Sequence, residues 1–346
     1  MCWFGIYDPA YSRNRVLMDG LRREGVVVLE CNERTGGVLK YVRLVRQLRA
    51  LRGKYDVLFC AFPVYINVLL AHWFQSKPVV ADAFFSKYEN VTAERASHSR
   101  WHPYAWLCYV ADWLLCRLPE HLITDTNAHK SFWQSLGAAV PITVVPVGAH
   151  SEEFYVKAVE RMSTNTLVQF HGSYIPLQGI DRIVSAVEQL QHRPDITFRF
   201  IGNGQLFPAI KAVVEAKDLP VTFVPWVSIA ELNDLLNEAD IVLGIFGNNK
   251  TDRVVPNKVF QGLAVRKPVI TKRTAAIEEV FTDAEVFLTK PDASDLADQI
   301  VYAVDRPDKA ARVAAAGYQK MQDMFTEVQL GKNLHQILQT LQSGRT

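Results

Sequence analysis

Cysteine is scarce in this chain of 346 residues, which has five cysteines in all. No two of them have the Cys-x-x-Cys spacing, and an odd number argues against a disulfide framework, so neither a structural zinc site nor cross-links are expected. No uncharged apolar run reaches the ~18 residues that a membrane-spanning helix needs. The N-terminal sequence MCWFGIYDP also lacks the basic region and apolar stretch of a signal peptide. We therefore expect a cytoplasmic protein with reduced thiols.

An excess of charge of one sign is also lacking. The formal net charge of +2 is too small for a general nucleic-acid-binding protein, so no nucleic acid partner is expected and a basic function would need a local cluster. Low-complexity segments are absent as well. The apolar content of 49% and the charged content of 21% are typical of globular proteins, and we expect the chain to fold throughout.

The length and the order of elements predict two domains. A chain of this size is too long for one ordinary core. Short apolar runs of strand length alternate with amphipathic helical runs, which is typical of βαβ units with parallel sheets. The predicted fold class is therefore α/β, with two Rossmann-like, doubly wound parallel sheets facing across a cleft. The sequence VGAH, residues 147–150, marks the boundary between domains 1–150 and 151–308, and a helical stretch over 309–346 can pack back on the first domain.

Residues 248–271, NNKTDRVVPNKVFQGLAVRKPVIT, are the most informative segment of the chain. They predict a loop, a helix over 258–265 and a strand over 269–271. Asn257 is the expected N-cap, and Lys258 lies in the first turn, where a cation opposes the helix dipole unless an anion lies between them. A bound diphosphate would resolve this conflict. The alternative is an ordinary solvated lysine.

Three turns in the second half follow predicted strands, at the edge where parallel sheets bind ligands. They are Gly172 to Gly179, Gly202-Asn203-Gly204 and the loop before Pro256. Backbone N–H groups of the first turn can face an anion, with Ser173 and Gln178 as neutral donors. The second turn lacks the GxGxxG spacing, which disfavours a nicotinamide cofactor. Such glycines can also serve only to close a turn.

A nucleotide base needs an apolar slot with a few backbone hydrogen bonds. The sequence VPWV, at the end of a predicted strand, offers Trp226 for such a slot. A tryptophan buried in the core is the alternative interpretation.

Several of these segments resemble one family. The sequences FHGSYIPLQGID, FRFIGNGQL and VPNKVFQGLAVRKPVIT are similar to the donor half of retaining glycosyltransferases of family 4, which have the GT-B fold, and VPVGAHSEEF resembles the junction between the two halves. The resemblance implies a nucleotide diphosphate sugar as donor, no metal ion, and transfer of a hexosyl group with retention. The implied acceptor is a glycan or a lipid-linked sugar in the synthesis of surface polysaccharide or glycoconjugate.

The sequence departs from the family pattern at four positions. Ser173 and Gln178 stand where the family usually has Arg and Lys, and Arg253 and Gln261 stand where it has a pair of Glu. The resemblance then makes Lys258 the main cation for the diphosphate. It leaves Gln261 for a ribose hydroxyl and Arg253 for a phosphate or the acceptor. A nucleotide-sugar epimerase and a non-catalytic protein that binds a nucleotide sugar or stabilises a partner are the alternatives.

The first half offers fewer candidates. Arg13 and Asn14 follow the first predicted strand, and Asp82 begins a long irregular segment over 82–103. We expect these three residues to face the cleft, with Asp82 holding a hydroxyl of the acceptor or of the donor sugar. A role for Asp82 as a turn or helix cap is the alternative.

Two segments of the first half suit a membrane surface. Residues 39–54, LKYVRLVRQLRALRGK, form a basic amphipathic helix, and residues 100–118 are rich in aromatic and aliphatic side chains. Both could contact an anionic membrane, which would place the protein on the inner face of the cell membrane. The alternative is that the apolar face of the first segment packs on the sheet and that the second is buried between domains.

Overall fold

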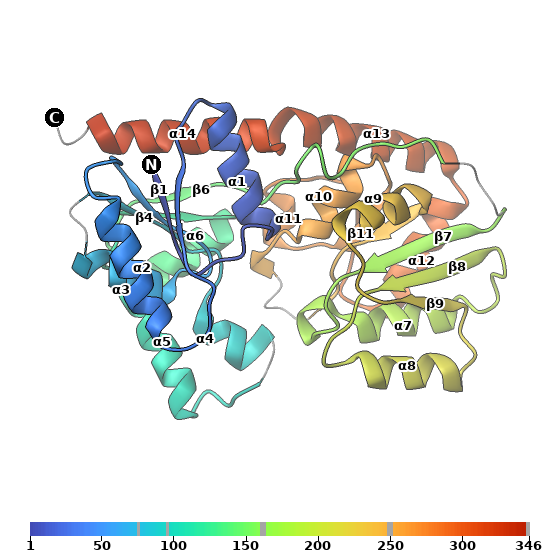
Figure 1. Ribbon diagram of the computed structural model, residues 1–346. Helices are drawn as coiled ribbons and strands as arrows, with labels where there is room; N and C mark the ends of the chain where they lie inside the picture. The colour runs from blue at the N-terminus through green and yellow to red at the C-terminus, as the bar shows by residue number, and fades with distance from the viewer. Residues whose placement is uncertain (75–76, 95–96, 160–163, 248–251, 344–346) are drawn as a thin grey trace. The chain divides into compact units, whose positions relative to one another are not determined.

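The computed structural model describes residues 1–74, 77–94, 97–159, 164–247 and 252–343 (Figure 1). The chain forms two compact units. Unit 1 combines Met1–Gly148 with Thr326–Thr346, and unit 2 is Ala149–Phe325. The predicted helical stretch over 309–346 is two helices, α13 (Pro307–Met324) and α14 (Glu327–Ser343), and only α14 belongs to unit 1.

Unit 1 contains a six-stranded sheet in the order β2-β1-β3-β4-β5-β6, in which every pair is parallel. Its strands are β1 (Cys2–Gly5), β2 (Leu29–Asn32), β3 (Leu58–Cys60), β4 (Val79–Asp82), β5 (His121–Thr124) and β6 (Ile142–Val144). Its helices, besides α14, are α1 (Ser12–Arg23), α2 (Leu39–Ala50), α3 (Tyr65–Phe74), α4 (Lys87–Glu89), the π-helical turn η1 (Asn90–Glu94), α5 (Pro103–Leu115) and α6 (Asn127–Ser135).

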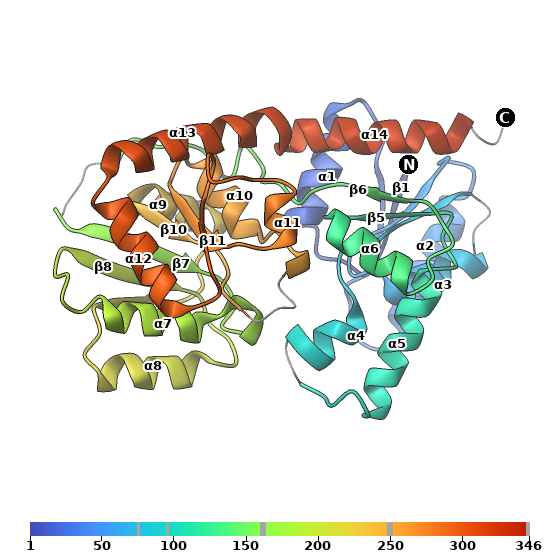
Figure 2. The same ribbon diagram turned by 180° about the vertical axis from the view of Figure 1, so that it is seen from behind.

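Helices cover both faces of this sheet. On one face, side chains of α2, α3 and α5 pack with the strands in one hydrophobic core. On the other face, α1 and α14 form a second core with the opposite side chains of the strands. The strands β4 and β5 are buried along their whole length, as expected for parallel strands with helices on both sides. Figures 1 and 2 show α14 beside α1 in both views.

Unit 2 contains a second six-stranded parallel sheet, in the order β12-β11-β10-β7-β8-β9. Its strands are β7 (Thr166–His171), β8 (Ile196–Ile201), β9 (Val221–Val224), β10 (Ile241–Leu243), β11 (Val269–Lys272) and β12 (Phe287–Thr289). Its helices, besides α13, are the 3-10 turn η2 (Pro176–Gln178), α7 (Ile180–Gln189), α8 (Phe207–Ala216), α9 (Ile229–Glu238), α10 (Asn257–Ala264), α11 (Ala275–Glu278) and α12 (Ala293–Val304). The prediction of two doubly wound parallel sheets is confirmed.

The five cysteines are all buried and free, and the part of the chain that the structure describes contains no helix long and apolar enough to cross a membrane.

Two glycines allow α14 to pack closely on α1. A Cβ atom at Gly20 would lie 2.1 Å from the carbonyl oxygen of Glu327 and 2.8 Å from the Cα atom of Gly331. Real Cβ atoms do not approach backbone this closely, so the two helix backbones can touch only because both residues lack a side chain. Leu330, Leu334 and Leu338 of α14 then reach the core of unit 1.

Replacing Gly20 by valine should therefore destabilise unit 1. Because the added methyl groups would overlap backbone atoms of α14, we expect a loss of about 1–3 kcal/mol, as for other overpacked sites. The free energy of unfolding can be measured by urea denaturation. Gly36→Val is the matched control, since a Cβ atom at Gly36 has no neighbour within 4 Å. Equal stability of the two variants would contradict the close helix contact.

Candidate functional site

The candidate site lies in unit 2 where the order of strands reverses. β7 is flanked by β8 on one side and by β10 on the other, and the chain continues outward in both directions. In open α/β sheets, ligands bind at the carboxyl ends of the strands at such a switch point. The turn after β7 and the helix α10 meet at this edge, because α10 follows β10 in the chain.

Lys258 connects these two segments. It is the second residue of α10, and only 5% of its surface is exposed. Its Nζ atom donates a hydrogen bond of 2.5 Å to Oε1 of Gln178, at the end of the turn after β7. The same atom lies 3.8 Å from the centre of the Phe170 ring, so the ammonium group faces an aromatic π-system.

The charge of Lys258 has no counter-ion among the described residues. Burial holds the pKa of its ammonium group well below the ordinary value of 10.5, because a cation loses hydration in the interior. Lys272 gives a useful contrast. It is also buried, but its Nζ atom lies 2.8 Å from a carboxylate oxygen of Asp252. An anion bound beside Lys258 would supply the charge that Asp252 supplies to Lys272.

The N-terminus of α10 differs slightly from the prediction. The helix begins at Asn257, with Pro256 as its N-cap, so Asn257 is not the capping residue. Pro256 makes no side-chain capping hydrogen bond, since proline has no side-chain acceptor. The N–H group of Val259 donates to the carbonyl oxygen of Pro256 at 3.0 Å, and those of Asn257 and Lys258 have no partner among the described residues. Residues 248–251 of the predicted loop lie outside the described residues.

The glycines of the two predicted turns hold backbone segments close together. A Cβ atom at Gly202 would lie 2.2 Å from the carbonyl oxygen of Gly172, and one at Gly204 would lie 2.6 Å from the backbone nitrogen of Tyr174. Gly172 also leaves room for the lysine, because a Cβ atom there would be 3.0 Å from Nζ of Lys258. The Gly202-Asn203-Gly204 turn thus packs directly against the backbone of the turn after β7. The side chain of Asn203 is exposed.

His171 and Gln261 form a second pair at this edge. A hydrogen bond of 2.9 Å joins Nε2 of His171 to Oε1 of Gln261. Burial, with a smaller effect of the nearby Lys258 charge, lowers the pKa of His171 to about 3, so the imidazole is neutral at pH 7. Its buried Nδ1 atom has no hydrogen-bond partner among the described residues. His171 directly precedes this turn in the sequence, but its contact with Gln261 was not predicted, and nothing in the sequence marked Phe170.

The remaining candidates of unit 2 are more accessible. Trp226 follows β9 and is 60% exposed, so the interpretation of this residue as core is wrong. Ser173 is half-buried in the turn after β7, and Arg253 is half-buried in a short helical turn. The described contacts bring Gly172, Gln178 and Lys258 together and join Gln261 to His171.

The candidates of unit 1 are arranged differently from the prediction. Arg13 and Asp82 are both fully buried and form an ion pair with Nε to Oδ2 at 2.8 Å. The guanidinium group also donates to the carbonyl oxygen of Val145 at 3.0 Å. Asn14 is buried as well, and its Nδ2 atom donates to the carbonyl oxygens of Asp8 and Phe62. The expectation that these residues face the cleft is therefore corrected for Arg13 and Asp82, whose charged groups pair inside unit 1. The buried Oδ1 atom of Asn14 has no hydrogen-bond partner among the described residues.

Metal-ligating side chains do not gather in the described part of the chain, where no three His, Cys, Asp or Glu residues lie close enough to hold a metal ion.

Comparison with known proteins gives one family and several solved structures. Residues 182–336 match the family described as Glycosyl transferase-like, and no curated protein sequence matches the chain. Sucrose-phosphate synthase from Thermosynechococcus elongatus is similar in structure, with a TM-score of 0.82 and 14% identity over 99% of each chain. Anabaena Alr3699/HepE, solved with UDP and glucose, has a TM-score of 0.75 and 15% identity over 98% of this chain and 99% of its own.

A third structure is more distant. A TarM variant of S. aureus, solved with fondaparinux, alpha-GlcNAc-glycerol and UDP, has a TM-score of 0.66 and 12% identity over 87% of this chain and 59% of its own. Structural similarity to proteins of 12–15% sequence identity shows the fold of this chain. The chain therefore has the GT-B fold of these glycosyltransferases, and its residues 182–336 carry the sequence pattern of the glycosyl transferase-like family.

Proposed function

We propose that this chain is a retaining glycosyltransferase of family 4 that needs no metal ion. It moves a hexosyl group from a nucleotide diphosphate sugar to a glycan or a lipid-linked acceptor in the synthesis of surface polysaccharide or glycoconjugate. The observation that carries the proposal is the buried Lys258, which lies at the switch point of unit 2 without a counter-ion among the described residues. An isolated buried cation is costly, and a diphosphate would offset that cost.

The diphosphate is the leaving group of the transfer. As the bond to the anomeric carbon breaks, negative charge grows on the departing oxygen, and donors placed in advance stabilise it. Lys258 supplies a positive charge, and the first N–H groups of α10 supply the positive end of the helix dipole. Ser173 and Gln178 add neutral donors from the turn after β7. The amide of Gln178 can rotate its NH2 group toward the phosphate once Lys258 turns to the anion.

The other parts of the donor have candidate partners in the same unit. The exposed ring of Trp226 offers an apolar surface to a nucleotide base, and the side chain of Gln261 offers a hydrogen bond to a ribose hydroxyl. Arg253 offers a cation to a phosphate or to the acceptor. The acceptor hydroxyl then approaches the anomeric carbon on the side that the diphosphate leaves, which retains the configuration without a carboxylate nucleophile.

A second function is favoured by two residues. Ser173 and Gln178 are neutral, whereas the glycosyltransferase family that this sequence resembles usually has two cations at these positions. The loss of these two charges weakens the stabilisation of a departing diphosphate. A protein with this site could bind a nucleotide sugar without transferring it. The two functions predict the same binding and differ only in turnover.

Thermal shift with UDP, GDP and ADP, each with and without EDTA, tests binding first. We expect one nucleotide to raise the melting temperature equally in both conditions, and UDP is the first choice because HepE was solved with it. Release of the nucleotide from its sugar conjugate then separates a transferase from a binder, and formation of an epimeric sugar would indicate an epimerase. The absence of any shift with all three nucleotides would contradict both proposed functions.

A further inference from the structure

Exposed apolar side chains are concentrated in one part of unit 1. Among the described residues, 20 large apolar side chains are exposed, and 11 of them come from residues 38–113. Six of these form what we call the aromatic surface, on α5 and the turn before it: Trp101, Tyr104, Trp106, Leu107, Tyr109 and Trp113. Trp101 is 81% exposed and Trp106 is 64% exposed. Soluble proteins rarely expose so many tryptophans together without a partner.

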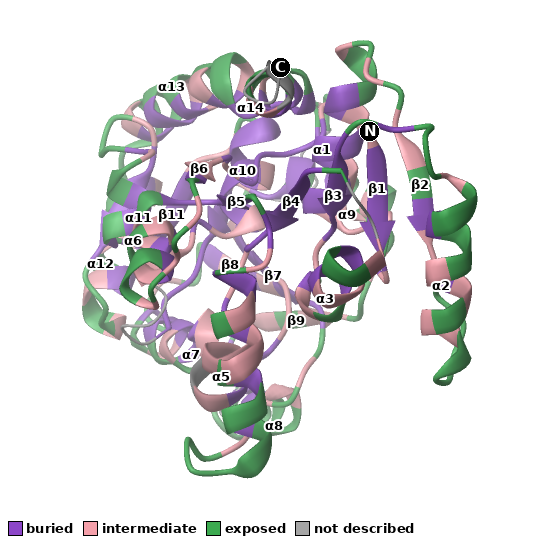
Figure 3. Cartoon of the chain, turned by 90° about the vertical axis from the view of Figure 1, so that its left-hand side faces the viewer, coloured by how far each residue is buried: buried purple, intermediate pink, exposed green. Residues whose placement is uncertain are grey.

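The neighbouring helix α2 presents a mixed face. Leu44 and Leu48, on the inward side of α2, pack into the core. This agrees with the alternative given above, in which the apolar face of the helix packs on the sheet. At 100° per residue, Leu39, Val42, Arg46 and Arg49 fall on the opposite side, and all four are exposed. Figure 3 shows exposed residues along the outer sides of α2 and α5. Apolar and cationic side chains thus share one outward face.

Cationic side chains predominate on α2 and along residues 97–118, although Glu33 pairs with Arg43 of α2 and Glu89 of α4 lies near α5. The sequence from Arg34 to Lys54 contains no acidic residue. At the aromatic surface, the guanidinium groups of Arg100 and Arg117 lie 5.0 Å and 4.1 Å from the ring centres of Trp101 and Trp113. The one carboxylate within residues 97–118, Asp112, is buried and accepts a hydrogen bond from Ser86. Tryptophan and tyrosine with arginine nearby are the side chains that bilayer interfaces favour.

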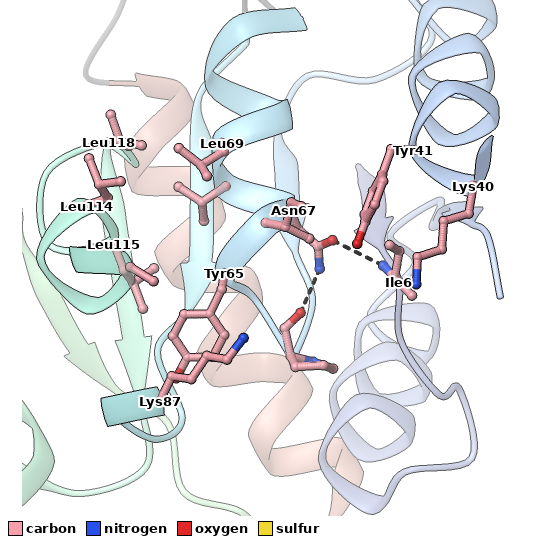
Figure 4. Close-up of a pocket in the computed structure, with 14 residues that line it drawn as sticks. Ile6, Lys40, Tyr41, Tyr65, Asn67, Leu69, Lys87, Leu114, Leu115 and Leu118 are labelled. Atoms are coloured by element: carbon pink, nitrogen blue, oxygen red, sulfur yellow. Dashed lines mark hydrogen bonds between the residues drawn. The ribbon is translucent and has the colours of Figure 1, made fainter. Parts of the chain in front are cut away.

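A pocket of about 350 Å³ opens among α2, α3 and α5, at the switch point between β1 and β3. Figure 4 shows Leu69, Leu114, Leu115 and Leu118 gathered at one end, and Lys40 at the other. Lys87 also lines the pocket, with its Nζ atom 5.3 Å from the centre of the Tyr65 ring. Neither lysine has an ion-pair partner among the described residues. An apolar end with free cations suits an amphiphile that carries a phosphate.

We propose that unit 1 docks on the surface of an anionic phospholipid bilayer, through the aromatic surface and the outward face of α2, and that the pocket receives one lipid. The rings lie at the depth of the lipid headgroups, where the indole N–H of tryptophan and the hydroxyl of tyrosine remain hydrated. The cations of α2 approach the lipid phosphates. A second copy of the chain fits this face poorly, because a symmetric contact would place the same cations against each other. The proposal does not depend on the transferase activity of unit 2.

Sedimentation of the full chain with vesicles tests the proposal. We expect binding to vesicles of phosphatidylcholine with about 30% phosphatidylglycerol, because the anionic headgroups give the surface a negative potential that attracts Lys and Arg. Binding should weaken as salt is raised and should be at least ten-fold weaker with phosphatidylcholine alone. The combined variant Trp101→Ser, Trp106→Ser and Trp113→Ser should lose at least ten-fold in affinity. Tyr302→Ser is the matched control, since Tyr302 is an exposed aromatic residue of unit 2 with no part in the proposed donor site, and it should bind vesicles like the unchanged protein.

Variants that remove a positive charge test the electrostatic contribution to bilayer binding. Arg46→Gln and Arg49→Gln should each weaken binding to the anionic vesicles about five-fold, and binding to neutral vesicles should not change. Lys40→Gln with Lys87→Gln should have a similar effect, because both lysines line the pocket that receives the lipid. An unchanged affinity of this double variant would contradict the binding of a lipid in the pocket. Circular dichroism and the melting temperature verify that each variant is folded.

Two results would overturn the proposal. One is an absence of binding to anionic vesicles at low salt. The other is a dimer in analytical ultracentrifugation that the tryptophan variant abolishes, which would assign the aromatic surface to self-association. The nucleotide-induced thermal shift of unit 2 is measured on the same samples, so a failure of bilayer binding is distinguished from a failure of the proposed function.

Discussion

Replacing Lys258 by methionine should abolish stabilisation by nucleotide and slow sugar transfer about 100- to 1,000-fold, the usual cost of removing one donor to a developing anion. The same change should raise the melting temperature of the ligand-free protein. Methionine fills a similar volume beside Phe170, and it removes a cation that is buried without a counter-ion among the described residues. Opposite effects on stability and activity are expected because the charge serves the ligand and not the fold.

The stability gained in Lys258→Met depends on pH, and the direction of this dependence follows from the lowered pKa of Lys258. The pKa of Lys258 in the folded protein lies well below the ordinary value of 10.5, so the unfolded chain binds more protons between those two values. The stability of the unchanged protein therefore rises with pH across this window. The advantage of Lys258→Met should be largest below the folded pKa and should disappear near pH 10.5. Melting temperatures of both proteins across this range measure the difference.

Lys272→Met is the matched control for this prediction. Lys272 is equally buried, but it pairs with Asp252 and donates to the carbonyl oxygen of Gly247. Its replacement leaves these oxygens without their partner and should lower the melting temperature. A Lys258→Met variant with unchanged nucleotide shift and unchanged turnover would remove this lysine from the mechanism.

Replacing Asp82 by alanine should lower the free energy of unfolding of unit 1 by about 3–5 kcal/mol. Asp82 is fully buried and accepts hydrogen bonds from Nε and Nη2 of Arg13. Without the carboxylate, the hydrogen bonds of the guanidinium group among the described residues go to carbonyl oxygens, and Asp125 acts on its charge without a hydrogen bond to it. Hydrogen bonds to neutral oxygens do not cancel its charge, so most of its desolvation cost is no longer offset.

A double variant separates the pair from its parts. Arg13→Met with Asp82→Leu removes both charges and should recover most of the loss, because apolar groups of similar size often replace a buried ion pair at little cost. Arg273→Ala serves as a surface control. Its carboxylate partners Glu278 and Asp283 are exposed, and such pairs contribute about 0–1 kcal/mol. Urea denaturation followed by far-UV circular dichroism reports the change. A loss below 1 kcal/mol for Asp82→Ala would contradict the role assigned to the pair.

The fold was predictable because it depends on local patterns. The apolar runs of β7 and β10 and the amphipathic segment of α10 are read directly from neighbouring residues. The predicted helix over 258–265 is displaced by one residue from Asn257–Ala264. This error arises because Asn257 is a good capping residue by type, whereas the backbone becomes helical directly after Pro256.

The partners of the candidate residues were less predictable. Arg13 and Asp82 are 69 positions apart, and no local pattern shows that the first turn of α1 directs its arginine to the end of β4. Phe170 belongs to an ordinary buried strand, and only the three-dimensional structure shows its ring beneath the ammonium group of Lys258. The sequence identified Lys258 and Gln178 as separate candidates, and their hydrogen bond is a result of the strand order of the sheet.

The division of the chain between the two units has a consequence for biosynthesis. Most of unit 1 precedes unit 2 in the chain, yet its helix α14 follows unit 2 and is therefore made after it. During translation of all of unit 2, the apolar side of α1 that receives Leu330 and Leu334 is left bare. A nascent chain thus exposes this apolar surface until α14 has been made, and termination after α13 would release a protein in which the surface is never covered.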